Sequence, residues 1–131
     1  MTERKWTNGS YFGYLYIAFA GLTDNELSDV EKGEIVNCVV EWWPEQRDDV
    51  IDEIDKAWKW VDEDLKAGGI ELVVDNVLNI AQELKEEYKE KSRKAILNDL
   101  VRIAVADNNF HENEKDWIRK IAEIFGIDFR V

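Results

Sequence analysis

Residues 103–114 read IAVADNNFHENE, and a related stretch, IAFAGLTDNELSDVE, occupies residues 17–31. Both open with Ile-Ala, one residue and Ala. Both continue with Asp-Asn, one residue, an apolar residue, three residues and Glu, although extra residues precede the Asp in the first copy. A motif repeated within one chain indicates two related structural units. The sequence therefore predicts two similar helix–turn–helix halves.

The repeated residues suit a corner between two helices. An Asp can cap its own turn, and an Asn after it tolerates a left-handed backbone. The apolar residue, Leu27 or Phe110, would anchor the turn in the core. The final Glu falls in the first turn of the next helix, where a negative charge interacts favourably with the helix dipole. Turn and cap chemistry alone would account for the acidic residues of both copies.

The same acidic residues, Asp24, Glu31, Asp107 and Glu114, also suit a cation site. Pseudo-twofold packing of the two halves would bring these carboxylates together, where they repel each other unless a cation or protons intervene. A cluster of oxygen ligands favours hard ions such as Ca²⁺, Mg²⁺ or Mn²⁺ over Zn²⁺. An EF-hand is excluded, because the position that needs Gly in a loop starting at Asp107 holds Glu112.

Helical periodicity covers most of the chain, and nothing alternates with the period of a strand. Pro44 and the pair Gly68-Gly69 mark helix boundaries, and a further break is expected near Ser92. The expected helices cover residues 10–21, 28–43, 44 or 48 to 67, 70 to about 91, 98–106 and 113–125. We therefore expect an all-α, compact single-domain bundle over residues 1–131, with about six to seven helices.

The third expected helix has an apolar stripe and an acidic face, and we expect the acidic face to be solvated. Val50, Ile54, Ala57, Trp58, Val61 and Leu65 recur at helical spacing and are expected to face the core. Trp60 lies about 240° around the helix from Ile54, at roughly 100° per residue, and is expected to point outward. An exposed Trp beside acidic residues suits a basic partner surface or a homodimer contact.

Net charge, cysteine content and the length of the apolar run indicate which partners and which cellular compartment to expect. A net charge of −12 disfavours nucleic acid and anionic membranes, and it favours cations and basic partner surfaces. Cys38 is the only cysteine, which fits a reducing cytosol, and its place on a helical stripe predicts a buried, inert thiol. The apolar run near the N-terminus is interrupted by Gly13 and is too short to span a bilayer. We expect a cytoplasmic protein without a membrane span.

Residues 103–127, IAVADNNFHENEKDWIRKIAEIFGI, resemble the signature of the tellurite-resistance TerB family and its TerB-like relatives. That family carries an Ala-Asp-Gly turn, an apolar residue and then a Glu, twice in one small helical domain. Asp24 and Glu31 match the first motif and Asp107 and Glu114 the second, with Asn in place of each Gly. The resemblance implies a helical bundle with pseudo-twofold halves, metal binding by the acidic turns, and a role in chemical-stress resistance or membrane-linked protein complexes.

Catalysis is not expected, because the chain shows no nucleophile triad, no phosphate-binding glycine loop and no cysteine-based metal spacing. His111, the only histidine, lies in a polar turn and is expected to be a surface residue. Two functions stay open. One is a non-enzymatic module that binds a divalent cation and acts in sensing or scaffolding. The other is a metal-free interaction domain or homodimer whose acidic turns are only structural.

Overall fold

The computed structural model describes residues 4–23, 29–106 and 112–129, and this part of the chain contains helices and no strand. The helices are α1 (Asn8–Thr23), α2 (Asp29–Trp42), the 3-10 turn η1 (Pro44–Gln46), α3 (Arg47–Glu87), α4 (Glu90–Val105) and α5 (Glu112–Phe125). The expected all-α class is confirmed. The repeated motifs fall at the α1–α2 and α4–α5 junctions, so each copy does join two helices.

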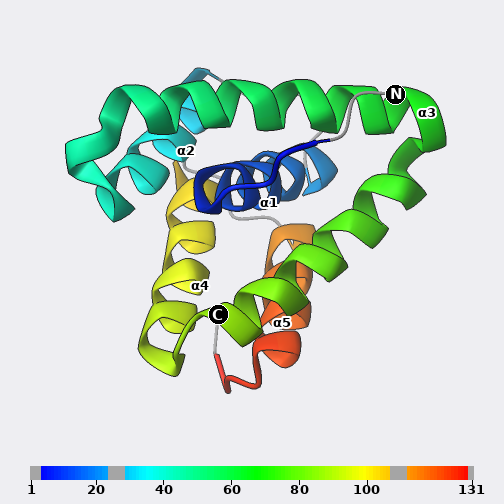
Figure 1. The fold of residues 1–131 in the computed structure, drawn as a ribbon. Coiled ribbons are helices and arrows are strands. Elements are labelled where there is room, and N and C mark those ends of the chain that lie inside the picture. Colours follow the sequence, from blue (N-terminus) through cyan, green and yellow to red (C-terminus); the bar gives the residue numbers. More distant parts are fainter. Residues whose placement is uncertain (1–3, 24–28, 107–111, 130–131) are drawn as a thin grey trace.

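Helix α1 lies in the centre of the molecule and contacts each of the other four α-helices (Figure 1). Its residues from Phe12 to Ala20 are all buried, as expected for a helix that is apolar on every side. Gly13 lets α3 approach closely, since a Cβ at this position would lie 3.1 Å from the Cβ of Ala57. The apolar run near the N-terminus is therefore the core of the fold.

Helix α3 changes direction at Gly69, which has φ 71° and ψ −164°. Residues 47–68 cross one side of the molecule, and residues 70–87 turn away toward α5 (Figure 1). Only Gly adopts this backbone region without strain. The predicted boundary at Gly68-Gly69 is thus a sharp kink. Because the helix continues through it, the described residues form five α-helices, slightly fewer than the six to seven expected.

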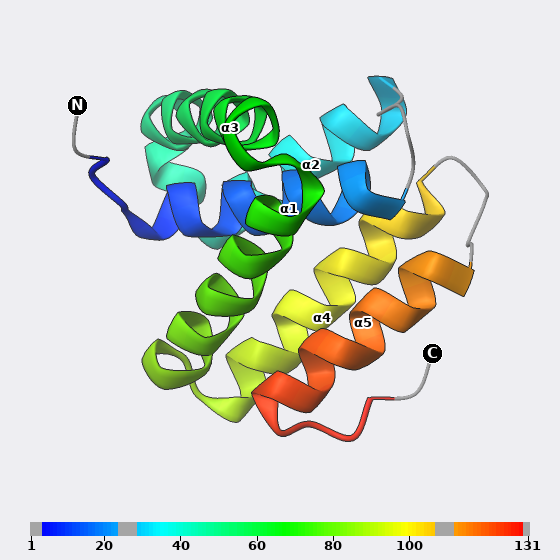
Figure 2. The same ribbon diagram turned by 90° about the vertical axis from the view of Figure 1, so that its right-hand side faces the viewer.

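The other boundaries are set by local backbone chemistry. Pro44 ends α2 as predicted and begins η1. The next break falls at Tyr88, which is extended at φ −116° and ψ 145°. The break expected near Ser92 is therefore slightly late, and the helix expected from residue 98 begins earlier, at Glu90. Gly126, at φ 70°, ends α5 as predicted. Helices α4 and α5 lie antiparallel and side by side (Figure 2).

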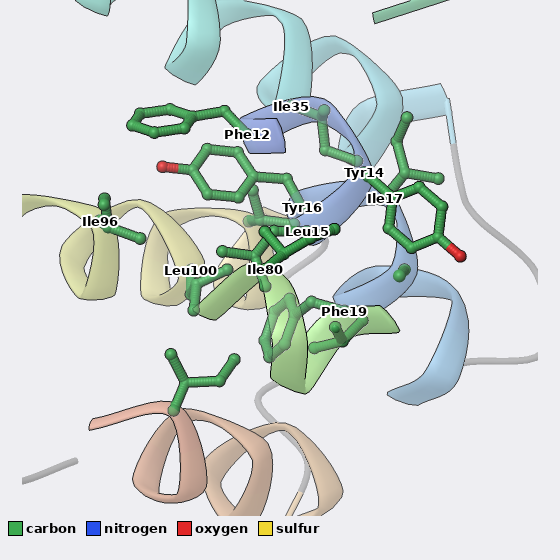
Figure 3. Packing of buried hydrophobic residues seen from close by; sticks show 14 of the residues in the cluster. Phe12, Tyr14, Leu15, Tyr16, Ile17, Phe19, Ile35, Ile80, Ile96 and Leu100 are labelled. Carbon is green, nitrogen blue, oxygen red and sulfur yellow. The ribbon is translucent and has the colours of Figure 1, made fainter. Parts of the chain in front are cut away.

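Buried side chains from every helix meet around α1 (Figure 3). One expectation for this core was wrong: Leu65 on α3 is 41% exposed, and the neighbouring Asp64 is buried in its place. Cys38 is fully buried with a free thiol, as predicted. Among the described helices, none has the length and apolar character needed to cross a membrane.

Candidate functional site

Two of the four predicted carboxylates occupy equivalent places in the two halves. Glu31 is the third residue of α2 and is 2% exposed; Glu114 is the third residue of α5 and is 3% exposed. Both residues engage in interactions within the protein. The starts of α2 and α5 lie on the same side of the molecule (Figure 2). Asp24 and Asp107 lie outside the described residues, as does His111.

The carboxylate oxygens of Glu31 and Glu114 are of a kind that suits a hard cation. Carboxylate oxygens are the ligands that Ca²⁺, Mg²⁺ and Mn²⁺ prefer. Within residues 4–23, 29–106 and 112–129, no three His, Cys, Asp or Glu side chains are grouped so that they could hold an ion.

A further buried carboxylate, Asp64 on α3, receives hydrogen bonds from three segments of the chain. The guanidinium of Arg4 donates to both of its oxygens, over 2.9 and 2.7 Å. The hydroxyl of Tyr14 donates over 2.7 Å, and the amide of Asn76 donates over 2.9 Å. Burial alone would raise the pKa of Asp64, but the hydrogen bonds from Arg4 and Tyr14 hold it below the ordinary value. Asp64 is therefore an anion at neutral pH.

Aromatic rings enclose this ion pair. The ring centroid of Trp6 lies 4.8 Å from that of Trp60, 5.0 Å from Tyr11 and 5.5 Å from Tyr14. The guanidinium of Arg4 lies 5.4 Å from the Trp60 centroid, within range of a cation–π interaction. Trp60, the residue expected to face a partner, is half-buried beneath Trp6 and Arg4.

Another buried carboxylate, Asp99 on α4, accepts hydrogen bonds from two neutral donors. One oxygen of Asp99 accepts hydrogen bonds from the hydroxyl of Tyr16 over 2.7 Å and from the indole of Trp42 over 2.8 Å. Burial raises the pKa of Asp99, although both hydrogen bonds oppose the rise. Burial likewise raises the pKa of the Tyr16 hydroxyl. The two hydrogen bonds to Asp99 therefore connect α1, α2 and α4 in the core.

Beside Asp99, Arg102 links α4 to α2. Its guanidinium donates to Glu34 over 2.8 Å and to both oxygens of Glu41 over 3.0 and 2.8 Å. The hydrogen bond from Arg102 lowers the pKa of Glu41. Cys38 lies on the same helix as both glutamates, and burial raises the pKa of its thiol to about 12. That thiol is protonated at neutral pH, which makes it a poor nucleophile.

Sequence reasoning missed Asp64 and Asp99, and a signal for each was present. Asp64 follows Val61 by three residues and Ala57 by seven, so it continues the inward stripe of α3. Asp99 lies between Ile96 and Ile103 on the inward stripe of α4 in the same way. An acidic residue at a core position of a helix indicates a buried partner. The identity of that partner depends on the tertiary fold.

Together these features define a small, acidic protein whose described residues are mostly helical and whose helices pack around the buried helix α1. The chain matches the family described as Tellurite resistance protein TerB over residues 17–130, which is most of its length. It therefore belongs to the TerB family. Comparisons with curated proteins and with solved structures find no match.

The family match begins at Ile17, in the middle of α1. Asp64, Trp60 and Asn76 lie within the matched region. Arg4 and Trp6, which cover them, lie before it. Asp64 thus lies in the matched region, whereas Arg4 and Tyr14, two of the residues that donate hydrogen bonds to it, precede the match.

Proposed function

We propose that this tellurite-resistance-type helical module is non-enzymatic and binds a hard divalent cation, Ca²⁺, Mg²⁺ or Mn²⁺, between its two acidic corners. The observation that carries the proposal is the equivalent burial of Glu31 and Glu114 at the third positions of α2 and α5. Asp24 and Asp107, seven residues before the Glu of each corner, would complete the ligand set. The module would act as a sensing or scaffolding unit.

Electrostatics support a cation at this position. The chain carries a net charge of −12, which attracts cations. A divalent ion shared by two corners would cancel repulsion between them and connect the α1–α2 half to the α4–α5 half. Metal binding would then be coupled to the packing of the two halves. A partner could recognise the surface that this coupling orders.

Thermal unfolding tests the proposal. The protein is melted with EDTA and then with millimolar Ca²⁺, Mg²⁺ or Mn²⁺, alongside the double variant Asp24→Asn/Asp107→Asn. An ion at about 100 times its dissociation constant stabilises the folded state by about 2.7 kcal/mol. That free energy raises the midpoint by roughly 5–15 °C for a domain of this size. The double variant should lose the shift while remaining folded.

A matched control separates a specific site from a general charge effect. Asp48→Asn/Asp52→Asn removes the same charge from exposed positions on α3, so it should keep the full cation-dependent shift. If no ion moves the midpoint of the wild-type protein, the cation proposal fails.

A metal-free interaction domain or homodimer is the second candidate function. It is favoured by Ile70, which is 62% exposed directly after the kink of α3 and close in sequence to the exposed Leu65. Exposed apolar side chains at one bend suit a protein contact. Sedimentation of the wild type and of Ile70→Lys tests this: a dimer that dissociates in the variant would support the contact. A monomer in both would remove the homodimer.

A further inference from the structure

The segment formed by residues 4–7 lies against α1 and α3 without helical structure of its own. Two side chains hold it there. Arg4 forms the bidentate ion pair with Asp64 and also lies 3.9 Å from Glu63. Trp6 packs among Tyr11, Tyr14 and Trp60. We call this segment the plug.

The surface under the plug is built for a guanidinium group. Asp64 is 7% exposed, and the hydrogen bonds from Tyr14 and Asn76 fix the orientation of its carboxylate. A planar guanidinium matches the two oxygens of a carboxylate better than an ammonium does. The ring of Trp60 makes a cation–π contact with the guanidinium of Arg4. The main-chain carbonyl oxygen of Trp60 lies 3.5 Å from a guanidinium nitrogen of the same arginine.

The rings that contact Trp6 form a second subsite, which suits an aromatic side chain, next to the subsite for the guanidinium. Trp60 contributes one wall at 4.8 Å between ring centroids, and Tyr14 contributes an edge at 5.5 Å. Tyr14 and Trp60 thus contact both Trp6 and the Arg4–Asp64 pair. Two adjacent subsites, one for a guanidinium and one for an aromatic ring two residues later, describe a short sequence pattern: Arg, any residue, aromatic.

We propose that Asp64, Tyr14, Asn76 and Trp60 form a binding site for an Arg-X-aromatic segment of a protein partner, and that Arg4 and Trp6 occupy this site in the resting chain. The plug is an autoinhibitory contact, and a partner segment of the same chemistry replaces it. Charge complementarity supports this partner, because the site is acidic and the whole chain carries a net charge of −12. The proposal is independent of the cation site.

The covalent connection between the plug and α1 keeps the site occupied by Arg4 and Trp6 in the absence of a partner. A segment joined to its site by a few residues competes at an effective concentration in the millimolar range. A free peptide at micromolar concentration therefore cannot displace the plug from the wild-type chain. Removing the two plug side chains removes this competition and exposes the affinity of the site itself.

The experiment uses the full-length chain with Arg4→Ala and Trp6→Ala, and a fluorescent peptide of sequence Gly-Arg-Lys-Trp-Thr followed by anisotropy. We expect the peptide to bind this double variant at least tenfold more tightly than the wild type. Adding Asp64→Asn should weaken binding at least tenfold, because the carboxylate that receives the guanidinium is lost. A peptide with Lys in place of Arg should bind more weakly to the double variant.

Circular dichroism confirms that each variant is folded. If the double variant is unfolded, Arg4→Gln/Trp6→Leu, which removes the guanidinium and the aromatic ring but keeps side-chain bulk, takes its place in the same titration. A folded variant that does not bind the peptide overturns the proposal, and so does binding that is unaffected by Asp64→Asn. Either result would make the Arg4–Asp64 pair a purely structural contact.

Discussion

Tyr14 and Tyr16 lie two residues apart on α1, and each donates a 2.7 Å hydrogen bond to a buried carboxylate, Asp64 on α3 and Asp99 on α4 respectively. Two residues correspond to about 200° around a helix, so the hydroxyls point to opposite sides of α1 (Figure 3). The central helix is therefore anchored by a polar contact on each side. Apolar packing alone would allow it to rotate or slide more easily.

Tyr16→Phe should destabilise the fold by about 1–3 kcal/mol, because it leaves the buried Asp99 with one donor fewer. The ring and its packing are kept. Urea denaturation followed by circular dichroism measures the loss. Tyr88→Phe is the matched control, since Tyr88 is half-buried in the aromatic cluster around Phe12 and Trp42. That variant should stay within about 0.5 kcal/mol of the wild type.

Asp64→Asn should lower stability at pH 7 by about 1.5–3 kcal/mol, the usual contribution of hydrogen bonds to a charged group. The pKa of Asp64 is lowered in the folded state. Its contribution is therefore present above the unfolded pKa of about 3.9 and is lost as the pH falls through the folded value. The difference in stability between wild type and variant should shrink from pH 6 toward pH 3. A difference that does not change with pH would contradict an ionised Asp64.

Asp99 should show the opposite dependence, because burial raises its pKa in the folded state. Its stabilising contribution is complete below the unfolded pKa of about 3.9 and is lost as the pH rises through the folded value. The stability of Asp99→Asn relative to wild type should therefore increase as the pH rises from 3 to 6. Measuring both aspartate variants over one pH series makes each the control for the other.

Cys38 should react with thiol reagents only when the protein unfolds. The side chain is fully buried, and its pKa of about 12 leaves almost no thiolate at pH 8. We expect labelling by a chromogenic disulfide to be at least roughly hundredfold slower in buffer than in denaturant. Labelling in buffer at the rate of the unfolded chain would show that α2 opens readily.

Gly69→Ala should destabilise the protein by about 1–3 kcal/mol, because φ 71° with ψ −164° is accessible almost only to Gly. Gly33→Ala on α2 tests the opposite case. A Cβ at Gly33 meets no atom within 4 Å, and Ala is the better helix former, so this variant should gain about 0.5–1 kcal/mol. Thermal melts of both variants measure the two changes in stability. A stabilised Gly69→Ala would show that the kink can straighten.

The helices could be predicted from the sequence because their ends depend on neighbouring residues. Pro44, Gly69 and Gly126 each impose a backbone angle that interrupts or ends a helix, wherever it lies in the fold. The break at Tyr88 was placed less well. No Pro or Gly marks it, and the ring of Tyr88 packs there against Phe12 and Trp42, which are distant in the sequence.

The carboxylate sites were less predictable because they depend on contacts between distant segments. Periodicity places Asp64 and Leu65 next to each other near the edge of the apolar stripe, and hydrophobicity alone favours burying Leu65. The structure buries Asp64 because Arg4, 60 residues earlier, and Tyr14 and Asn76 supply its hydrogen bonds. By contrast, the positions of Glu31 and Glu114 near helix starts followed from the repeat itself.

The enclosure of α1 has a consequence for synthesis on the ribosome. Translation produces this apolar helix before any of the helices that cover it, and α5, one of those it contacts, is produced last. The side chains of Leu15 and Phe19 are buried in the folded protein. They cannot be fully buried until almost all of the helices have left the exit tunnel. Nascent chains of this protein should accordingly depend on chaperones that hold apolar segments during elongation.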